Sequence, residues 1–222
     1  MTKSTSIPPH VESSLSISPS THSFSFSSPP TFSMTLLSHA SQPITLFTWD
    51  TPLHLQGCLS NNSITIIDLT TGTPVPTCVV RIQRKPITRL RGSGDEQLYL
   101  TLEPDISVTL TKPFGRGPAN GSVVVKPLPK HLIQHGWELN GKGEQIKIRR
   151  LKRATGVDGL EAGHSYEVSV RREMLECVKW AFATKEEVLV DERKGAAIQD
   201  FEWEGEAKIE WDVTAAVVDV ID

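Results

Sequence analysis

The sequence predicts an all-β protein, an antiparallel β-sandwich, and three observations support this prediction. Short segments in which apolar and polar residues alternate recur along the chain, with Gly, Pro, Asn and Asp between them, which is typical of sandwiches and barrels. One such segment opens at Tyr166 after a glycine-containing turn, and two others flank Asn140-Gly141. Because successive side chains of a strand point to opposite faces, each alternating segment can bury one face in a core.

Alternating or β-branched segments of the first half predict strands, with turn residues between them. These segments are 15–17, 24–26, 32–36, 43–49, 63–69, 78–82, 98–102 and 106–110. We interpret Phe32–Leu36 and Pro43–Trp49 as the two arms of a hairpin that turns at Ser38–Gln42. Trp49 is then a candidate anchor in the core.

The stretch after Leu110 is rich in Gly and Pro and predicts an insertion at about residues 112–153. A short strand is expected at Ser122–Val125. Asn140-Gly141 between Trp137–Leu139 and Gln145–Ile148 indicates a hairpin, because Asn-Gly favours the turns that join two antiparallel strands. We expect one domain at residues 11–222 that carries this insertion. Residues 1–10 are expected to be a disordered tail, because they are mostly small and polar and include Pro8-Pro9.

The last fifty residues mix helical and extended signals. Residues 171–180 favour a short helical turn followed by a strand. Thr184–Glu187 has the spacing of a capping box, although Val188–Val190 is strand-like, so both readings stay open. Ile209–Val213 is the expected final strand, with an acidic outward face. We expect at most one or two short helices in the whole chain.

Composition excludes some classes of function. The 222 residues carry a net charge of -3, which argues against a general polyanion binder but leaves a local basic patch open. The three cysteines form no CxxC pair, and reduced thiols are expected, with a Cys58–Cys78 bridge as the alternative. Neither a secretory signal nor an apolar run of membrane-spanning length is evident, so we expect a cytoplasmic or nuclear protein without membrane partners.

The clearest charged feature is the basic run Lys147–Arg153. Its cations are Lys147, Arg149, Arg150, Lys152 and Arg153. With Trp137 they form a candidate interaction surface, and the alternative reading is a solvated strand of the hairpin. His131 and His135 would share one helical face, but Leu follows His131 where a zinc protease motif has Glu, so we expect no metal. No nucleophile elbow or phosphate-binding loop is present, and we expect no cofactor and no catalytic residue.

The segment from Leu160 through Gly163 to Tyr166 resembles the tyrosine corner of immunoglobulin-like and fibronectin-type sandwiches. The resemblance implies that the Tyr166 ring packs inside and its hydroxyl bonds a nearby backbone group, with Leu160 and Gly163 completing the structural corner. The block Phe32–Phe114 is also similar to the non-catalytic N-terminal sandwich of fungal deuterolysin-type metalloproteases. Pro43–Trp49 and Ala154–Leu160 resemble stretches of uncharacterised proteins of filamentous fungi.

Two functions of different classes follow from these observations. The first is a non-enzymatic, intracellular sandwich that acts through protein–protein contacts, because sheet edges and end loops recruit partner strands or peptides; the same edges could also join copies of this chain. The alternative is a small-molecule-binding protein, or a cyclase or isomerase of a fungal biosynthetic pathway without a named motif, which requires a cavity. Nucleic-acid binding through Lys147–Arg153 is a third hypothesis, disfavoured by the acidic balance.

Overall fold

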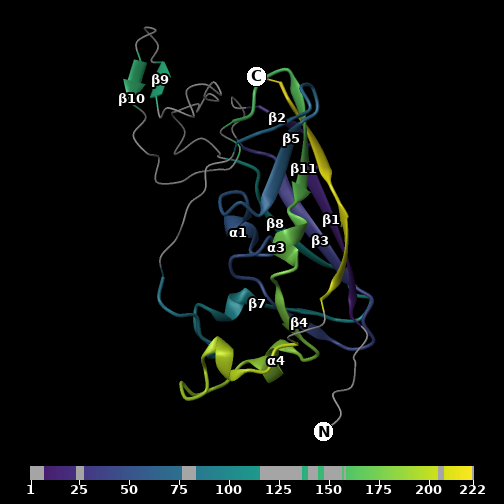
Figure 1. The fold of residues 1–222 in the computed structure, drawn as a ribbon, viewed down its shortest axis with the longest axis vertical. Coiled ribbons are helices and arrows are strands. Elements are labelled where there is room, and N and C mark those ends of the chain that lie inside the picture. The colour runs from purple at the N-terminus through teal and green to yellow at the C-terminus, as the bar shows by residue number, and fades with distance from the viewer. Residues whose placement is uncertain are drawn as a thin grey trace.

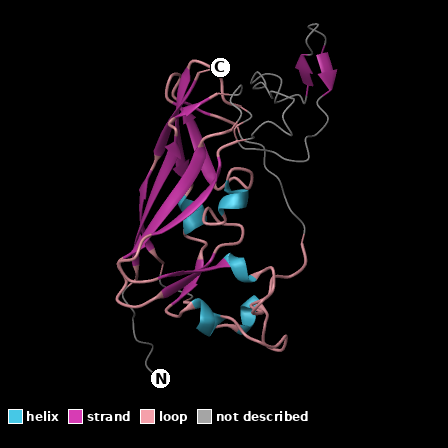
Figure 2. Ribbon diagram, turned by 180° about the vertical axis from the view of Figure 1, so that it is seen from behind, coloured by secondary structure: helices cyan, strands magenta, loops and turns pink. Residues whose placement is uncertain are grey.

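In the computed structural model, strands dominate and two large sheets pack face to face, with a smaller sheet beside one end of them (Figures 1 and 2). The structure describes residues 8–23, 28–76, 84–115, 157, 159–204 and 208–221, together with the main chain of 137–139 and 145–147. The fold is an all-β sandwich.

The first sheet has the strand order β13-β1-β3-β8. Its strands are β1 (His10–Ser18), β3 (Thr31–Ser38), β8 (Val108–Pro113) and β13 (Glu210–Thr214). β1 lies antiparallel to β3 and parallel to β13, and β3 lies antiparallel to β8. In β1 every second residue from Val11 to Ile17 is buried, Ser13 among them, while Glu12, Ser14 and Ser16 between them are exposed. The alternation of β1 and β3 therefore gives this sheet one apolar face and one hydroxyl-rich face.

The second sheet has the order β2-β14-β11-β5-β6. Its strands are β2 (Thr21–His22), β5 (Ile64–Asp68), β6 (Thr73–Pro74), β11 (His164–Val170) and β14 (Ala216–Val220). β11 lies antiparallel to both β5 and β14. The chain passes from the first sheet to the second at Ala215, between β13 and β14.

One core lies between the two large sheets. Phe32, Met34 and Leu36 of β3 face Tyr166 and Val168 of β11, and none of these side chains has exposed surface. Both sheets thus bury their apolar faces against each other, which is the arrangement that stabilises a sandwich.

The third sheet, β12-β4-β7, corrects the predicted hairpin. β4 (Ile44–Phe47) pairs with β7 (Tyr99–Leu102) and β12 (Lys179–Ala181), and not with β3. β3 has no edge left for β4, because β1 and β8 occupy both. β4 is buried along its whole length, since one face joins the main core and the other a second cluster with Tyr99 and Val188.

Trp49 is half-buried against this second cluster rather than an anchor of the main core. Likewise, the segments 98–102 and 106–110 are neighbours in sequence, but β7 and β8 belong to different sheets. Short connections between alternating segments therefore did not predict which strands pair.

The short helices follow local signals. The described residues include α1 (Leu55–Cys58), α3 (Arg172–Leu175) and α4 (Lys185–Val188), one more than expected. α3 leads into β12, as the sequence predicted. The capping box is present at α4: Thr184 and Glu187 each accept a hydrogen bond from the other's backbone N–H, which decides between the helical and strand readings of this segment.

Of the remaining strand predictions, one is wrong, one is confirmed, and several fall outside the described residues. Ile209–Val213 is not the final strand, because β14 follows β13. The Asn-Gly hairpin is confirmed by the antiparallel pairing of β9 (Trp137–Leu139) with β10 (Gln145–Lys147). The predicted strands at 24–26, 78–82 and 122–125, and most of the 112–153 insertion, lie outside the described residues. Of the expected tail, residues 1–7 lie outside them, and β1 already begins at His10.

Candidate functional site

β8 is one of the two edge strands of the first sheet, and β13 is the other. β8 pairs with β3 on one side, and no described strand pairs with its other side. The backbone N–H of Phe114 donates to the Pro30 carbonyl over 2.7 Å. This bond shows which residues of β8 point their backbone groups toward β3, because hydrogen-bonded and non-hydrogen-bonded pairs alternate along two antiparallel strands. Lys112 and Leu110 therefore bond toward β3, and the backbone groups of Thr109 and Thr111 point to the free edge.

Only a short part of this edge can pair with a further strand. Pro113 follows Thr111 at the next edge-facing position, where its missing N–H costs no bond to β3. The alternation of the pairs places one N–H and one C=O on the free side at each of Thr109 and Thr111, and none of the described hydrogen bonds outside the ladder uses them. A short stretch of β8 is thus open to a further strand, and Pro113 ends it.

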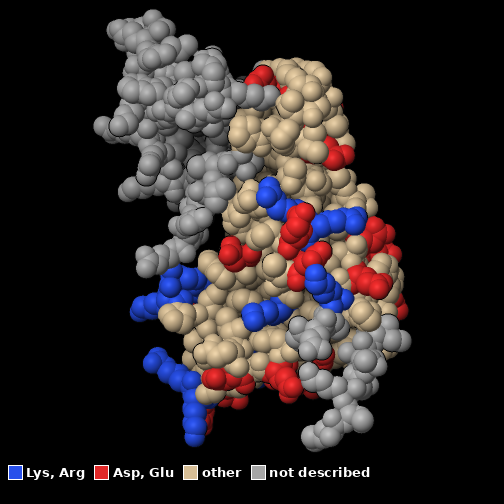
Figure 3. Space-filling view, viewed as in Figure 1, with Lys and Arg blue, Asp and Glu red and all other residues tan. Residues whose placement is uncertain are grey.

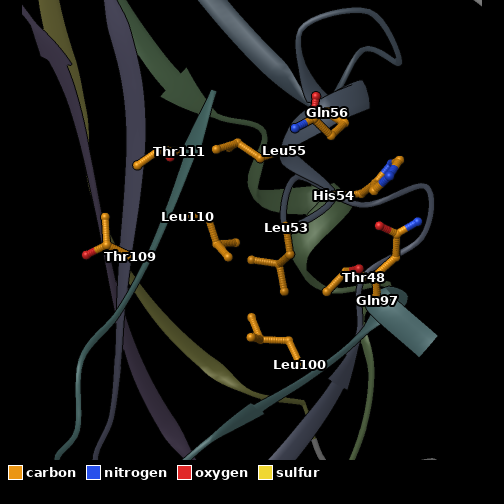
Figure 4. Close-up of a pocket in the computed structure, with 10 residues that line it drawn as sticks. All are labelled: Thr48, Leu53, His54, Leu55, Gln56, Gln97, Leu100, Thr109, Leu110 and Thr111. Carbon is orange, nitrogen blue, oxygen red and sulfur yellow. The ribbon is translucent and has the colours of Figure 1, made fainter. Parts of the chain in front are cut away.

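A cavity of about 300 Å³ lies directly beside this edge (Figure 4). Leu53, Leu100 and Leu110 point toward one another across it, whereas the Thr109 side chain points away. Thr109 and Thr111 nevertheless line the cavity, so their main chain forms part of its wall. The polar groups on the rim come from the segment before β5 and from the turn that leads into β7, and they are Thr48, His54, Gln56 and Gln97.

The wall opposite β8 is held in place by hydrogen bonds within its own loop. The Thr48 hydroxyl donates to the Leu98 carbonyl (3.1 Å), and the Thr51 hydroxyl donates to the Thr48 carbonyl (2.6 Å). Leu53, Leu55 and Cys58 are buried beneath the loop. These anchors fix the start of α1 next to β8, where Lys112 Nζ donates to the Gln56 carbonyl over 3.3 Å.

Cationic and aromatic groups gather around His54, which lines the cavity. The Arg84 guanidinium lies 4.5 Å from the centre of the Trp49 ring, and the His54 ring lies 5.0 Å from that ring. Burial, together with the charges of Arg84 and Lys112, lowers the pKa of His54. Burial also lowers the pKa of Lys112. His54 is therefore a neutral hydrogen-bonding group at pH 7, beside two cations.

The two cations have different partners. Arg84 forms an ion pair with Asp95, whose second oxygen accepts from the Thr88 N–H over 2.9 Å. Lys112 has no carboxylate within 4.0 Å among the described residues, and its hydrogen bond there goes to a neutral carbonyl. The positive charge of Lys112 is thus available to a ligand in the adjacent cavity.

The residues of the expected corner lie elsewhere, in the second sheet. Tyr166 has no exposed surface; its hydroxyl accepts from the Glu161 N–H (2.7 Å) and donates to the Glu161 carbonyl (3.4 Å). Leu160 is also fully buried. Gly163 adopts φ = 81°, a backbone conformation that favours glycine, and its N–H donates to the Val220 carbonyl. These contacts brace the turn before β11 and line no cavity described above.

A buried carboxylate lies close to the corner. Asp68 has no exposed surface, and its two oxygens bond His164 Nδ1 (2.8 Å) and the backbone N–H groups of Thr70 (2.9 Å) and Thr71 (3.2 Å). Burial alone would raise the pKa of Asp68, but these hydrogen bonds outweigh it and lower the pKa. The pair holds the turn between β5 and β6 against β11, a structural use of both residues.

The basic run lies largely outside the described residues. Only the main chain of Trp137 and Lys147 is described, and there the two residues are direct partners in the hairpin. Arg149, Arg150, Lys152 and Arg153 fall outside, so the interaction surface stays a prediction. His131 and His135 fall outside as well, and no group of three or more potential metal ligands occurs in the part of the chain that the structure describes.

Sequence reasoning missed the cavity beside β8, although the sequence held one signal of the edge strand that borders it. Alternation that ends in Lys112-Pro113 is typical of an edge strand, since Lys and Pro there discourage uncontrolled pairing. The Lys112 charge lies near enough to lower the pKa of His54. This proximity had no such signal in the sequence, because it depends on the position of α1.

Comparison of the chain with models of known protein families and with curated proteins gives no match in either case. Among the described helices, none has the length and apolar character needed to cross a bilayer.

Proposed function

We propose that this chain is a non-enzymatic binding module that captures an extended segment of a partner protein by strand addition to β8. The single observation that carries the proposal is the free edge at Thr109 and Thr111 with a cavity directly beside it. In strand addition, main-chain hydrogen bonds supply affinity, and pockets for alternate side chains supply specificity. Both elements are present here within one short stretch.

The sheet geometry defines how such a segment lies. It would run next to β8, about 4.8 Å away, and bond the free N–H and C=O groups of Thr109 and Thr111. Side chains on one face of the segment would then point to the side of Leu110, into the cavity between Leu53 and Leu100. Pro113 would limit the pairing to a few residues.

An intracellular location belongs to the same proposal. Cys58 and Cys177 are free thiols, which accords with a reducing compartment.

Random heptapeptides displayed on phage and selected on the immobilised full chain would test this function. Selected peptides, labelled and measured by fluorescence anisotropy, should lose binding to Thr111→Pro, which removes an edge-facing N–H without removing a bond to β3. Thr111→Val keeps the backbone and should bind as wild type does. Thr109→Pro is a second block of the edge if Thr111→Pro fails to fold, as judged by circular dichroism.

Peptides that bind Thr111→Pro and Thr109→Pro as tightly as wild type would refute strand addition. Dimerisation of the wild-type chain that both proline variants abolish would identify a second copy of the chain as the occupant, and would also refute a separate partner protein.

The cavity also favours the second candidate function, binding of a small apolar molecule. Its volume of about 300 Å³ lies at the lower end of the range for small-molecule sites. A ligand that uses only the cavity should bind Thr111→Pro normally and be excluded by Leu100→Phe, which fills the cavity. Displacement of bound anilinonaphthalene sulfonate measures this binding, and equal binding by the two variants would count against it.

A further inference from the structure

Lys112 is a charged group beside the cavity that the proposed function does not use. It occupies the position two residues after Leu110 on the same face of β8, and its side chain is half-buried. An ammonium group has three donors, and one of them reaches the Gln56 carbonyl at 3.3 Å. Partial burial of a charge is unfavourable unless that charge is paired, so a carboxylate placed here would be stabilised.

The neighbouring groups leave this charge uncompensated. Arg84 adds a second positive charge near His54, and Asp95 is engaged by Arg84 and by the Thr88 backbone. The Asp50 charge also acts on His54, but no described carboxylate reaches Lys112 within ion-pair distance. Figure 3 shows acidic and basic residues interspersed over the lower part of the described surface. Attraction of an acid to this cavity therefore depends on local contact with Lys112, not on a broadly basic face.

We propose that the segment added to β8 carries an apolar residue and an acidic residue two positions apart, the first seated against Leu110 and the second paired with Lys112. This inference rests on the proposed function and specifies its ligand. The spacing follows from the period of two: residues i and i+2 of an added strand face the same side and oppose residues two apart on β8. An acid at i+1 or i+3 would point to the other face of the sheet, toward Thr109 and Thr111.

The cavity and the charge act on different side chains of the same segment. The leucines around the cavity accept the apolar side chain, and the Lys112 ammonium donates to the carbonyl of Gln56, a residue that lines the cavity. His54, neutral at pH 7 because burial and the adjacent cations lower its pKa, can donate a second hydrogen bond to the same carboxylate. The recognition unit is thus an apolar residue and an acidic residue with one residue between them, in extended conformation.

Three labelled octapeptides in a Thr/Val background test the pattern against the full chain by fluorescence anisotropy. The first carries Leu and Glu two positions apart, the second has Gln in place of Glu, and the third has Leu and Glu three apart. Wild type should bind the first about ten-fold more tightly than the second or third, as expected for a hydrogen bond to a charged group.

Lys112→Gln should remove this preference, and Lys112→Arg, which keeps the charge, should retain most of it. Raised salt should weaken binding of the Glu peptide more than binding of the Gln peptide.

The outcomes separate the two proposals. If the Leu-containing peptides bind wild type and lose binding to Thr111→Pro, but Glu and Gln peptides bind equally, the function stands and the acidic pattern is wrong. If no peptide binds, or if binding is indifferent to Thr111→Pro, strand addition fails and the acidic pattern with it. A preference for Glu that survives Lys112→Gln overturns the assignment to Lys112.

Discussion

Tyr166→Phe is the perturbation that tests the architecture most directly. It leaves the buried ring in place and removes only the hydroxyl that binds the backbone of Glu161. The short bond is the one in which the hydroxyl accepts from the Glu161 N–H over 2.7 Å. After substitution this N–H is left beside a phenyl ring, without its acceptor.

The expected cost follows from the loss of this acceptor. A buried polar group that loses its partner costs about 1–3 kcal/mol, whereas the ring contributes no further loss because its volume is unchanged. For a chain of this size each kcal/mol lowers the melting temperature by about 2–4 °C. Tyr166→Phe should therefore lower it by roughly 2–12 °C.

Tyr99→Phe is the matched control, because Tyr99 and Tyr166 are the two tyrosines of the chain. The Tyr99 hydroxyl only donates, to the Thr88 carbonyl over 3.2 Å. That carbonyl keeps a second lone pair for water or another donor, so the loss should be about 0.5–1.5 kcal/mol. The two substitutions differ in whether an acceptor is removed from a backbone N–H.

Urea unfolding followed by tryptophan fluorescence measures both variants, and an unchanged slope with denaturant would show that the two-state transition is intact. Tyr166→Phe with the stability of wild type, or with a smaller loss than Tyr99→Phe, would refute the idea that this hydroxyl braces the turn.

Three further predictions concern stability and reactivity. Arg89 is buried and donates to the carbonyls of three residues in the loop around 188–197; Arg89→Met should cost at least about 3 kcal/mol in urea unfolding, and the exposed Arg91→Met less than about 1 kcal/mol. Hydrogen bonds lower the pKa of Asp68 in the folded chain below the unfolded value of about 3.9. The contribution of Asp68 to the free energy of unfolding is therefore present above pH 4 and lost as the pH falls toward the folded pKa. In Asp68→Asn the free energy of unfolding should fall less steeply between pH 5 and pH 2 than in wild type. Burial raises the pKa of Cys58 to about 12, so iodoacetamide should modify Cys177 in the native chain and Cys58 only after unfolding, as read by mass spectrometry; equal rates at the two cysteines would contradict this.

Local patterns were read correctly from the sequence where the physics is local. The capping box at Thr184–Glu187 depends on two side chains and the backbone between them, and of the two readings left open the helical one forms. The Asn-Gly hairpin at Trp137–Lys147 depends on one turn, and its arms pair. β14 was missed although Ala216, Val218 and Val220 alternate with other residues. Only Ala215 separates it from β13, and no turn residue marks the boundary between the two strands.

Pairing between distant segments was not readable in the same way. β3 and β4 are both extended as predicted, yet they belong to different sheets. Alternation shows which face of a strand is apolar, but several partners can cover that face equally well. β4 is buried on both faces, and this requires a second cluster built from α4 and the residues around Trp203. The residues of β4 alone do not indicate that such a cluster exists.

The sequence by itself determined an all-β chain, most of its described strands, and the caps and turns whose bonds span a few residues. Only the tertiary structure decided that no described strand pairs with the outer edge of β8, that a cavity lined by His54 lies beside it, and that the Lys112 charge lies near His54. The reason is physical: the period of a strand is set by its own backbone, whereas a free edge exists only once every other strand has found its partner.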